Sequence, residues 1–285
     1  MPTFTVRRGS VRLAARTFGS RGPHLVLIHG LASSQHIWDL VVPRLERHFR
    51  VATYDQRGHG ESSRPSSGYD FATVAADLGV VLRAIGAKRA VLVGHSYGAN
   101  VAIEYAVRRA TGIAGVVCVD GGMGSMSEVM TWKQARQMLA PPKFAGTPIE
   151  EYLAMVKSHL PRGRWSPEVE AIVRSLVHVD ARGRVRPRLS RTNHMRILRA
   201  MYDQNPKDLL ARIRVPVLMS CARPRRGDDD EREFYEMKKR STVEIQRVNP
   251  NVKIEWITSI HDMPIDRPRE LADRIARFAT TEARA

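Results

Sequence analysis

Cysteine is scarce in this chain of 285 residues, which contains only Cys118 and Cys221. Two cysteines inside apolar stretches cannot build a disulfide framework, and nothing else in the sequence indicates an oxidising compartment. We expect both to be buried free thiols that pack like small apolar side chains. The sequence also has no paired-cysteine motif and no His-x-x-x-His spacing, so it predicts no metal site.

Long apolar runs are missing as well. No stretch of about 18 apolar residues occurs, so the sequence predicts no transmembrane helix. The N-terminal stretch MPTFTVRRGSVRLAARTFG carries charges where a signal peptide would have its apolar core. Hydrophobic residues make up 43% of the chain, which is enough for a sizeable core. These features predict a cytoplasmic globular protein.

Acidic residues are few relative to basic ones. The chain has 29 Asp and Glu against 46 Lys and Arg, which gives a formal net charge of +17. Such a charge favours association with anions. The arginines are nevertheless spread along the chain, and there is no basic tail, zinc-finger spacing or aromatic-rich RNA-binding signature. The sequence therefore predicts no nucleic-acid partner, and it leaves the oligomeric state open.

Strand-like apolar runs alternate with helical patterns over most of the chain. Two short strands are expected around the turn at Arg8-Gly9-Ser10, followed by strands within 24–30, 50–54, 89–95, 113–119, 215–222 and 252–259. Helices are expected over 33–47, 71–85, 99–109 and 268–279. This alternation predicts βαβ units and a mostly parallel sheet.

The alternation stops between residues 124 and 214. Helical patterns cover 126–138, 149–159, 167–177 and 190–205, and the joints APPKFAGTP and LPRGRWSP are rich in proline and glycine. We expect 124–214 to form a helical cap over the carboxyl edge of the sheet, where open α/β sheets bind ligands. The core domain would then comprise 1–123 and 215–285.

A serine lies between two glycines where an apolar strand meets a helix, in Gly94-His95-Ser96-Tyr97-Gly98. Gly-X-Ser-X-Gly between a strand and a helix is typical of a nucleophile elbow, a tight turn that needs small residues on both sides. The turn exposes the serine hydroxyl beside the amino end of the helix, whose free N–H groups suit a developing oxyanion. Ser96 is therefore the candidate nucleophile.

Four segments together resemble the α/β-hydrolase fold family. They are LVLIHGLASS, VATYDQRGHGESSRP, VLVGHSYG and HDMPIDRP, and they follow one another in the family's order over nearly the whole chain. The resemblance is to serine-nucleophile, esterase- or lactonase-like members with a helical cap. It implies a mostly parallel, eight-stranded α/β-hydrolase sheet flanked by helices, with the cap inserted after the sixth strand.

A serine needs a base at neutral pH. Among the ten histidines, His261 follows the last expected strand and precedes the last helix, the position of the catalytic histidine in the family. We expect His29 and His95, beside the oxyanion loop and the elbow, to provide supporting hydrogen bonds. His59 is expected to organise the RGHGES loop.

The acid that orients the histidine has two candidate locations. The family usually carries it after the penultimate strand, but here VPVLMSCARPRRGDDDE has no carboxylate at that point, and Asp228, Asp229 and Asp230 come several residues later in a charged run. Some members place it one strand earlier, which corresponds to Asp120 at the end of VVCVD. We favour Asp120 and keep the three later aspartates as alternatives.

The predicted activity is hydrolysis of a carboxylic ester or lactone through an acyl-enzyme, with the backbone N–H groups of Leu31 and Tyr97 as the oxyanion hole. A serine at the elbow argues against epoxide hydrolases and haloalkane dehalogenases, which need a carboxylate there. Apolar cap residues suggest a small, largely apolar substrate, and no cofactor is expected. Thioesterase, C–C hydrolase or perhydrolase activity with the same triad stays open, as does a non-hydrolytic lyase, cyclase or ligand-binding protein on this fold.

Overall fold

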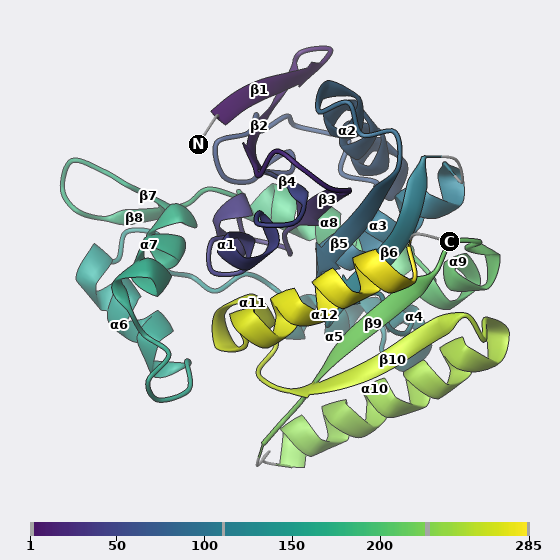
Figure 1. The fold of residues 1–285 in the computed structure, drawn as a ribbon. Helices are drawn as coiled ribbons and strands as arrows, with labels where there is room; N and C mark the ends of the chain where they lie inside the picture. The colour runs from purple at the N-terminus through teal and green to yellow at the C-terminus, as the bar shows by residue number, and fades with distance from the viewer. Residues whose placement is uncertain (1–2, 110–111, 226–228, 284–285) are drawn as a thin grey trace.

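The computed structural model describes residues 3–109, 112–225 and 229–283, which form an eight-stranded sheet covered by helices (Figure 1). The strand order is β1-β2-β4-β3-β5-β6-β9-β10; the β1–β2 and β2–β4 pairs are antiparallel and all the others are parallel. The strands are β1 (Thr3–Arg8), β2 (Val11–Phe18), β3 (His24–Ile28), β4 (Arg50–Tyr54), β5 (Ala90–His95), β6 (Ile113–Val119), β9 (Val217–Arg223) and β10 (Val252–Thr258). The expected sheet is confirmed.

Helices cover both faces of this sheet. They are η1 (Gln35–Trp38), α1 (Val42–Leu45), α2 (Phe71–Ala84), α3 (Tyr97–Arg108), α10 (Asp229–Val248), α11 (Met263–Asp266) and α12 (Pro268–Thr281). In β3, Val26 and Ile28 belong to the apolar cluster with α2 and α3, whereas Leu25 and Leu27 belong to the cluster with α1 and α12. Successive side chains of a strand point to opposite faces, so a strand covered on both sides is apolar throughout.

The segment between β6 and β9 is only partly as expected. It contains α4 (Met126–Val129), α5 (Trp132–Met138), α6 (Ile149–Ser158), α7 (Pro167–Ser175), β7 (Val177–Val179), β8 (Val185–Pro187), α8 (Arg191–Asp203) and α9 (Pro206–Arg212). The expected helix over 126–138 is interrupted because Thr131 caps a new helix through a reciprocal capping box with Gln134. The antiparallel β7–β8 hairpin and α9 were not expected.

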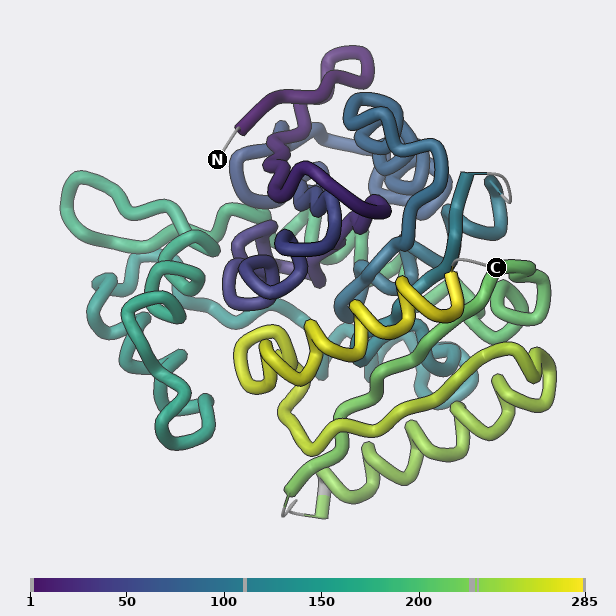
Figure 2. The backbone as a smooth tube through the Cα atoms, in the orientation of Figure 1, coloured from purple at the N-terminus to yellow at the C-terminus, as the bar shows by residue number. Residues whose placement is uncertain are grey.

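The two parts of this segment pack differently. In Figures 1 and 2, α6, α7 and the β7–β8 hairpin form a lobe that stands away from the sheet. Helices α8 and α9 instead contribute Ile197 and Leu210 to the apolar cluster that includes α2 and α3. The boundaries of a separate cap at 124–214 therefore stay a prediction.

Elsewhere, one expected helix was wrong in detail and one helix was missed. The helix expected over 33–47 is divided into η1 and α1, and Pro43 lies in the first turn of α1, where its missing N–H is tolerated. The charged run at Asp229 begins the 20-residue helix α10, which was not expected. Its buried side chains include Lys238, Thr242 and Ile245, so polar residues obscure the apolar periodicity.

Both cysteines are free and buried, as expected. Burial raises the pKa of the Cys118 thiol to about 12. Among the described residues, no helix combines the length and apolar character needed to cross a membrane. Within the same residues, no group of three His, Cys, Asp or Glu side chains is arranged to hold a metal ion.

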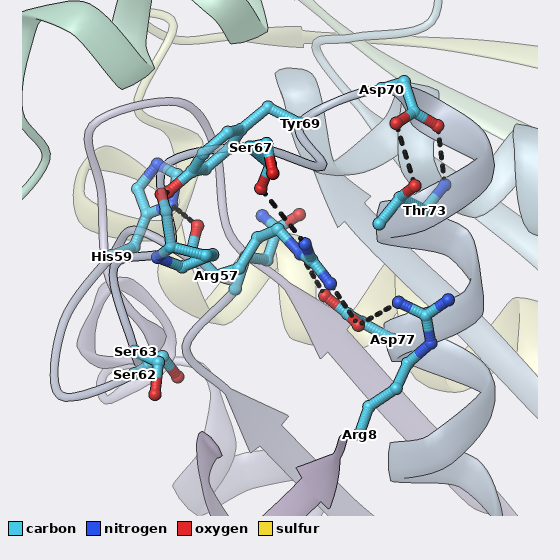
Figure 3. Close-up of polar contacts among 12 residues, drawn as sticks. Arg8, Arg57, His59, Ser62, Ser63, Ser67, Tyr69, Asp70, Thr73 and Asp77 are labelled. Carbon is cyan, nitrogen blue, oxygen red and sulfur yellow. Dashed lines mark hydrogen bonds and ion pairs between the residues drawn. The ribbon is translucent and has the colours of Figure 1, made fainter. Parts of the chain in front are cut away.

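A buried ion pair attaches the loop after β4 to α2 (Figure 3). Arg57 donates from Nε to Asp77 Oδ2 at 2.6 Å and from Nη2 to Oδ1 at 2.8 Å, and the two side chains are 4% and 1% exposed. Arg8 from β1 reaches the same carboxylate at 3.4 Å. A bidentate pair of this kind fixes the loop that leads toward His59.

We predict that Asp77→Ala destabilises the protein by about 3–5 kcal/mol, because it leaves the Arg57 charge buried without its main partner. Urea unfolding of the variant and the wild type measures the difference. The matched control is Asp273→Ala, which removes a partner of Arg44 from a half-exposed surface pair and should change stability by less than about 1 kcal/mol. Equal effects of the two changes would contradict the prediction.

Candidate active site

Ser96 occupies the sharp turn between β5 and α3. Its backbone has φ 52° and ψ −123°, a conformation that non-glycine residues rarely adopt. A Cβ at Gly94 would lie 2.2 Å from the carbonyl oxygen of Gly98, and a Cβ at Gly98 would lie 2.3 Å from that of Ile28. Both glycines are therefore required by close backbone contacts, as the elbow motif predicts.

Two backbone hydrogen bonds hold the strained turn. The Ser96 N–H donates to the Val119 carbonyl at 2.9 Å, and the Ala99 N–H donates to the Ser96 carbonyl at 2.9 Å. A Cβ at Gly121 would lie 2.2 Å from the Ser96 carbonyl oxygen, so the ends of β5 and β6 are in direct backbone contact. Strain of about 1–3 kcal/mol is kept where the surrounding structure leaves no alternative.

Asp120 follows β6 immediately and is also strained, with φ 42°. Its side chain is 2% exposed, and its Oδ2 lies 2.7 Å from Nδ1 of His261. The other oxygen, Oδ1, accepts from the Ala222 N–H at 2.8 Å and from the Lys238 ammonium at 3.0 Å. Burial alone would raise the pKa of Asp120, but the hydrogen bond to His261 and the nearby positive charges outweigh it and lower this pKa.

His261 lies in the loop between β10 and α11. Its carbonyl oxygen is 3.0 Å from Nε2 of His95, and the two rings are 4.9 Å apart between centroids. The His261 side chain is 52% exposed. Partial loss of hydration by itself lowers its pKa. The hydrogen bond and charge of Asp120 more than offset this, so the pKa of His261 is raised above its ordinary value of 6.5.

The structure thus brings two of the three predicted triad side chains into direct contact. Asp120 hydrogen-bonds His261, while Ser96 adjoins them through the backbone of β6 and through its neighbour His95. Within the described residues, no hydrogen bond links the Ser96 hydroxyl to His261. Such bonds are often long in enzymes without substrate.

The alternative acids have different surroundings. Asp229 begins α10, is fully exposed, and contacts Arg232 at 3.4 Å on the surface. Asp228 and the side chain of Asp230 lie outside the described residues. Of the candidate acids whose side chains the structure describes, Asp120 is the one in contact with His261.

The loop after β3 lies against Ser96. A Cβ at Gly30 would be 3.1 Å from the Ser96 Cβ. Leu31, the next residue, is therefore close to Ser96. Tyr97 is the first residue of α3, and its N–H has no acceptor within the helix. In the part of the chain that the structure describes, no protein group accepts a hydrogen bond from the Leu31 N–H. Both predicted oxyanion donors are thus on segments that meet at Ser96.

Two buried histidines fix the shape of this loop. Nδ1–H of His29 donates to the Gly30 carbonyl at 2.8 Å, and Nε2 accepts from the Gln56 N–H at 3.0 Å. His59 accepts from the Ala32 N–H at 3.2 Å, and its Nδ1–H donates to the Arg57 carbonyl at 3.0 Å. The tautomers follow from these backbone partners. The supporting roles expected for both residues are confirmed.

Burial keeps both rings neutral. It lowers the pKa of His29 to about 4 and that of His59 to about 3. Charge repulsion from His95 adds to the lowering at His29, and repulsion from His29 and His194 adds to it at His59. A charged ring could not accept the backbone N–H that each Nε2 now accepts. The loop geometry therefore depends on two uncharged imidazoles.

A pocket of about 330 Å³ opens beside His261. Its lining includes Asp120, Lys238 and His261, together with apolar side chains such as Phe234 and Ile260. Ser96 is not part of the lining, so the pocket borders the Asp120–His261 side of the site. Sequence reasoning missed Lys238, because a lysine next to polar residues gives no sign in the sequence that its side chain is buried.

We predict that the protein loses stability as the pH falls below 6.5, because unfolded histidines then bind protons that folded His29 and His59 do not. The loss should be about 1.4 kcal/mol per pH unit for each ring and should end near the folded pKa values of about 4 and 3. Urea unfolding between pH 7.5 and pH 5 measures this slope.

Carboxylates contribute to the same slope, so variants isolate the histidine part. His59→Gln retains an acceptor for the Ala32 N–H but cannot titrate, and it should flatten the slope by about 1.4 kcal/mol per pH unit. His48→Gln, at an exposed position, is the control and should leave the slope as it is. A His59→Gln slope equal to that of the wild type would refute the neutral-ring account.

Comparison with known proteins shows that the chain is similar to several hydrolases. The sequence profile of the alpha/beta hydrolase fold family matches residues 23–147. A 2-(acetamidomethylene)succinate hydrolase of Mesorhizobium japonicum is 31% identical over 147 residues, which cover 51% of this chain and 52% of that protein. The chain thus spans about half the length, or less, of the curated relatives it matches.

Solved structures resemble the whole chain. The crystal structure of E-2-(acetamidomethylene)succinate hydrolase covers 98% of each chain with a TM-score of 0.78 and 20% identity. The thioesterase domain from the curacin biosynthetic pathway covers 97% of this chain and 99% of its own, with a TM-score of 0.77 and 18% identity. The chain therefore has the α/β-hydrolase fold over nearly its whole length, and residues 23–147 match the sequence profile of the alpha/beta hydrolase fold family.

Proposed function

We propose that the protein is a serine hydrolase that cleaves a carboxylic ester or lactone of a small, largely apolar substrate through an acyl-enzyme. One observation carries this proposal: the strained turn of Ser96 adjoins a histidine whose Nδ1 is 2.7 Å from a buried carboxylate. This is the arrangement of a nucleophile, a base and an orienting acid. The proposed substrate partner is a small molecule, and the proposed location is the cytoplasm.

The first half of the reaction acylates Ser96. Nε2 of His261 takes the proton from the Ser96 hydroxyl as its oxygen attacks the substrate carbonyl carbon. Asp120 accepts from Nδ1–H, which holds the tautomer with a free Nε2 and stabilises the imidazolium that forms. The protonated Nε2 then donates to the leaving alcohol oxygen as the tetrahedral intermediate collapses.

The second half releases the acid. Nε2 of His261 removes a proton from a water molecule, which attacks the acyl carbon, and the same proton returns to Ser96 as the ester bond to the enzyme breaks. The negative oxygen formed in each half would lie between the N–H groups of Leu31 and Tyr97. The 12-residue helix α3 starts at Tyr97, and its dipole adds partial positive charge there.

The type of nucleophile limits the reaction. Curated relatives include a soluble epoxide hydrolase of Corynebacterium sp. and a fluoroacetate dehalogenase of Burkholderia sp.. A reaction that forms an alkyl ester on the enzyme needs a carboxylate nucleophile, whereas this elbow carries Ser96. The serine therefore favours acyl transfer, in line with the thioesterase domain and the enol-lactonase among the structural neighbours.

We predict that a fluorophosphonate probe forms a covalent adduct at Ser96, because the probe requires an activated serine. Mass spectrometry of the labelled protein locates the adduct, and Ser96→Ala should abolish it. Ser220→Ala is the control and should label like the wild type, since Ser220 is a fully buried serine on strand β9, which pairs with β6. Undiminished labelling of Ser96→Ala would refute the assignment.

A panel of p-nitrophenyl esters of increasing acyl length then defines the substrate class. Ester hydrolysis in the wild type and its loss in Ser96→Ala would support the proposal. Labelling at Ser96 without hydrolysis of any ester, lactone or thioester would instead favour a different acyl-transfer reaction at the same serine.

A further inference from the structure

A lysine is buried beside the carboxylate that contacts His261. Lys238 lies near the middle of α10, and its side chain is only 7% exposed. Its ammonium donates to Asp120 Oδ1 at 3.0 Å and to the Ala222 carbonyl at 2.6 Å. The ammonium also lies 5.1 Å from the centre of the Phe234 ring. Burying an ammonium is unfavourable by several kcal/mol unless partners compensate, so this placement needs an explanation.

The two oxygens of Asp120 have separate partners. Oδ1 accepts from Lys238 and from the Ala222 N–H, whereas Oδ2 faces Nδ1 of His261. Rotation of the carboxylate would break the contacts on Oδ1, because neither donor can follow it: Ala222 is backbone and Lys238 is also bound to the Ala222 carbonyl. The carboxylate is thus held in the orientation that presents Oδ2 to the ring.

We propose that Lys238 is a positioning residue of the catalytic site, which fixes the Asp120 carboxylate toward His261 and balances part of its negative charge. The inference rests on the proposed serine-hydrolase function. It goes beyond that function because neither Lys238 nor α10 belongs to the nucleophile, base or acid. The ammonium binds the side of Asp120 opposite His261, so it acts on the ring only through the carboxylate.

The charge balance has a defined direction. Asp120 raises the pKa of His261, and Lys238 lowers it. Further titratable and charged groups around the ring are His95 from β5 and Asp262 in its own loop. The lining of the shared pocket adds Arg225, Glu231, Tyr235 and Asp266. Among them, Asp262 also raises the pKa of His261. Lys238 is the cation in contact with the carboxylate that holds the ring.

Lys238 therefore keeps more of His261 in the neutral form that can accept the serine proton. Without the ammonium, Asp120 would stabilise the imidazolium more strongly, and a higher pH would be needed to deprotonate the ring. The rate of serine acylation would then fall mainly on the acid side of its pH profile. A purely structural lysine would change the rate by the same factor at every pH.

The test is the pH dependence of inactivation by a fluorophosphonate, measured as the second-order rate constant between pH 5 and pH 9. Lys238→Met retains the length of the side chain and removes its charge. We expect its acid limb to shift upward by roughly half a unit to one unit, which is about a three- to tenfold slower reaction at pH 6. At pH 8.5 the difference from the wild type should be smaller.

Two variants serve as comparisons. Lys238→Arg retains the charge and should keep the acid limb at the wild-type position. Lys239→Met removes the adjacent lysine, which is 46% exposed and bound to Glu236 on the surface, and should leave the whole profile unchanged. If Lys238→Met does not fold, Lys238→Gln retains a donor for Asp120 without the charge and should shift the limb in the same direction.

An unshifted acid limb in folded Lys238→Met or Lys238→Gln, with a uniform change in rate, would overturn the proposal and leave Lys238 as an anchor of α10. The proposal would also be overturned if Lys238→Arg shifted the acid limb as far as Lys238→Met does. Failure of the proposed function looks different, because the wild type itself would then carry no adduct at Ser96.

Discussion

The burial of the Asp120 carboxylate is the constraint on which the rest of the site depends. An ionised carboxylate that is 2% exposed must be surrounded by donors, and here they come from three separate elements: His261 after β10, the Ala222 N–H in β9 and Lys238 in α10. The hydrogen bonds of this one carboxylate therefore join Asp120 to three residues that are each more than 100 positions away in the sequence. The position of His261 follows from this requirement, and so does the docking of α10 on the end of the sheet.

Ser96 reaches the same place through the backbone rather than through side chains. The Ser96 N–H donates to the Val119 carbonyl, and the Asp120 N–H donates to the Ser220 carbonyl, so the ends of β5, β6 and β9 are aligned. Gly94 and Gly121 permit contacts that any side chain would prevent. Neutral His29 and His59 hold the loop after β3 in place against Ser96. The proposed nucleophile, base and acid are thus placed by a continuous hydrogen-bonded edge of the sheet.

The sequence predicted those parts of the structure whose cause is local or periodic. The apolar strands, the glycines around Ser96 and the carboxylate at the end of β6 are all visible in short stretches. Helix α10 was missed because Lys238 and Thr242 lie on its buried face, and the partners of Lys238, Asp120 and Ala222, are distant in the sequence. The β7–β8 hairpin was missed because its strands are only three residues each, too short to show an alternating pattern. Tertiary contacts decide such segments, and composition does not.

A double-mutant cycle on Asp120 and His261 tests the central claim, that Asp120 acts through His261, most directly. It measures kcat/KM for the wild type, Asp120→Asn, His261→Ala and the double variant with the p-nitrophenyl ester that the wild type hydrolyses fastest. If Asp120 acts through His261, Asp120→Asn alone should lose about 10⁴-fold, and the double variant should be no slower than His261→Ala alone. Losses that multiply in the double variant, or nearly full activity in folded Asp120→Asn, would contradict the account and return the acid to the charged stretch that begins at Asp228.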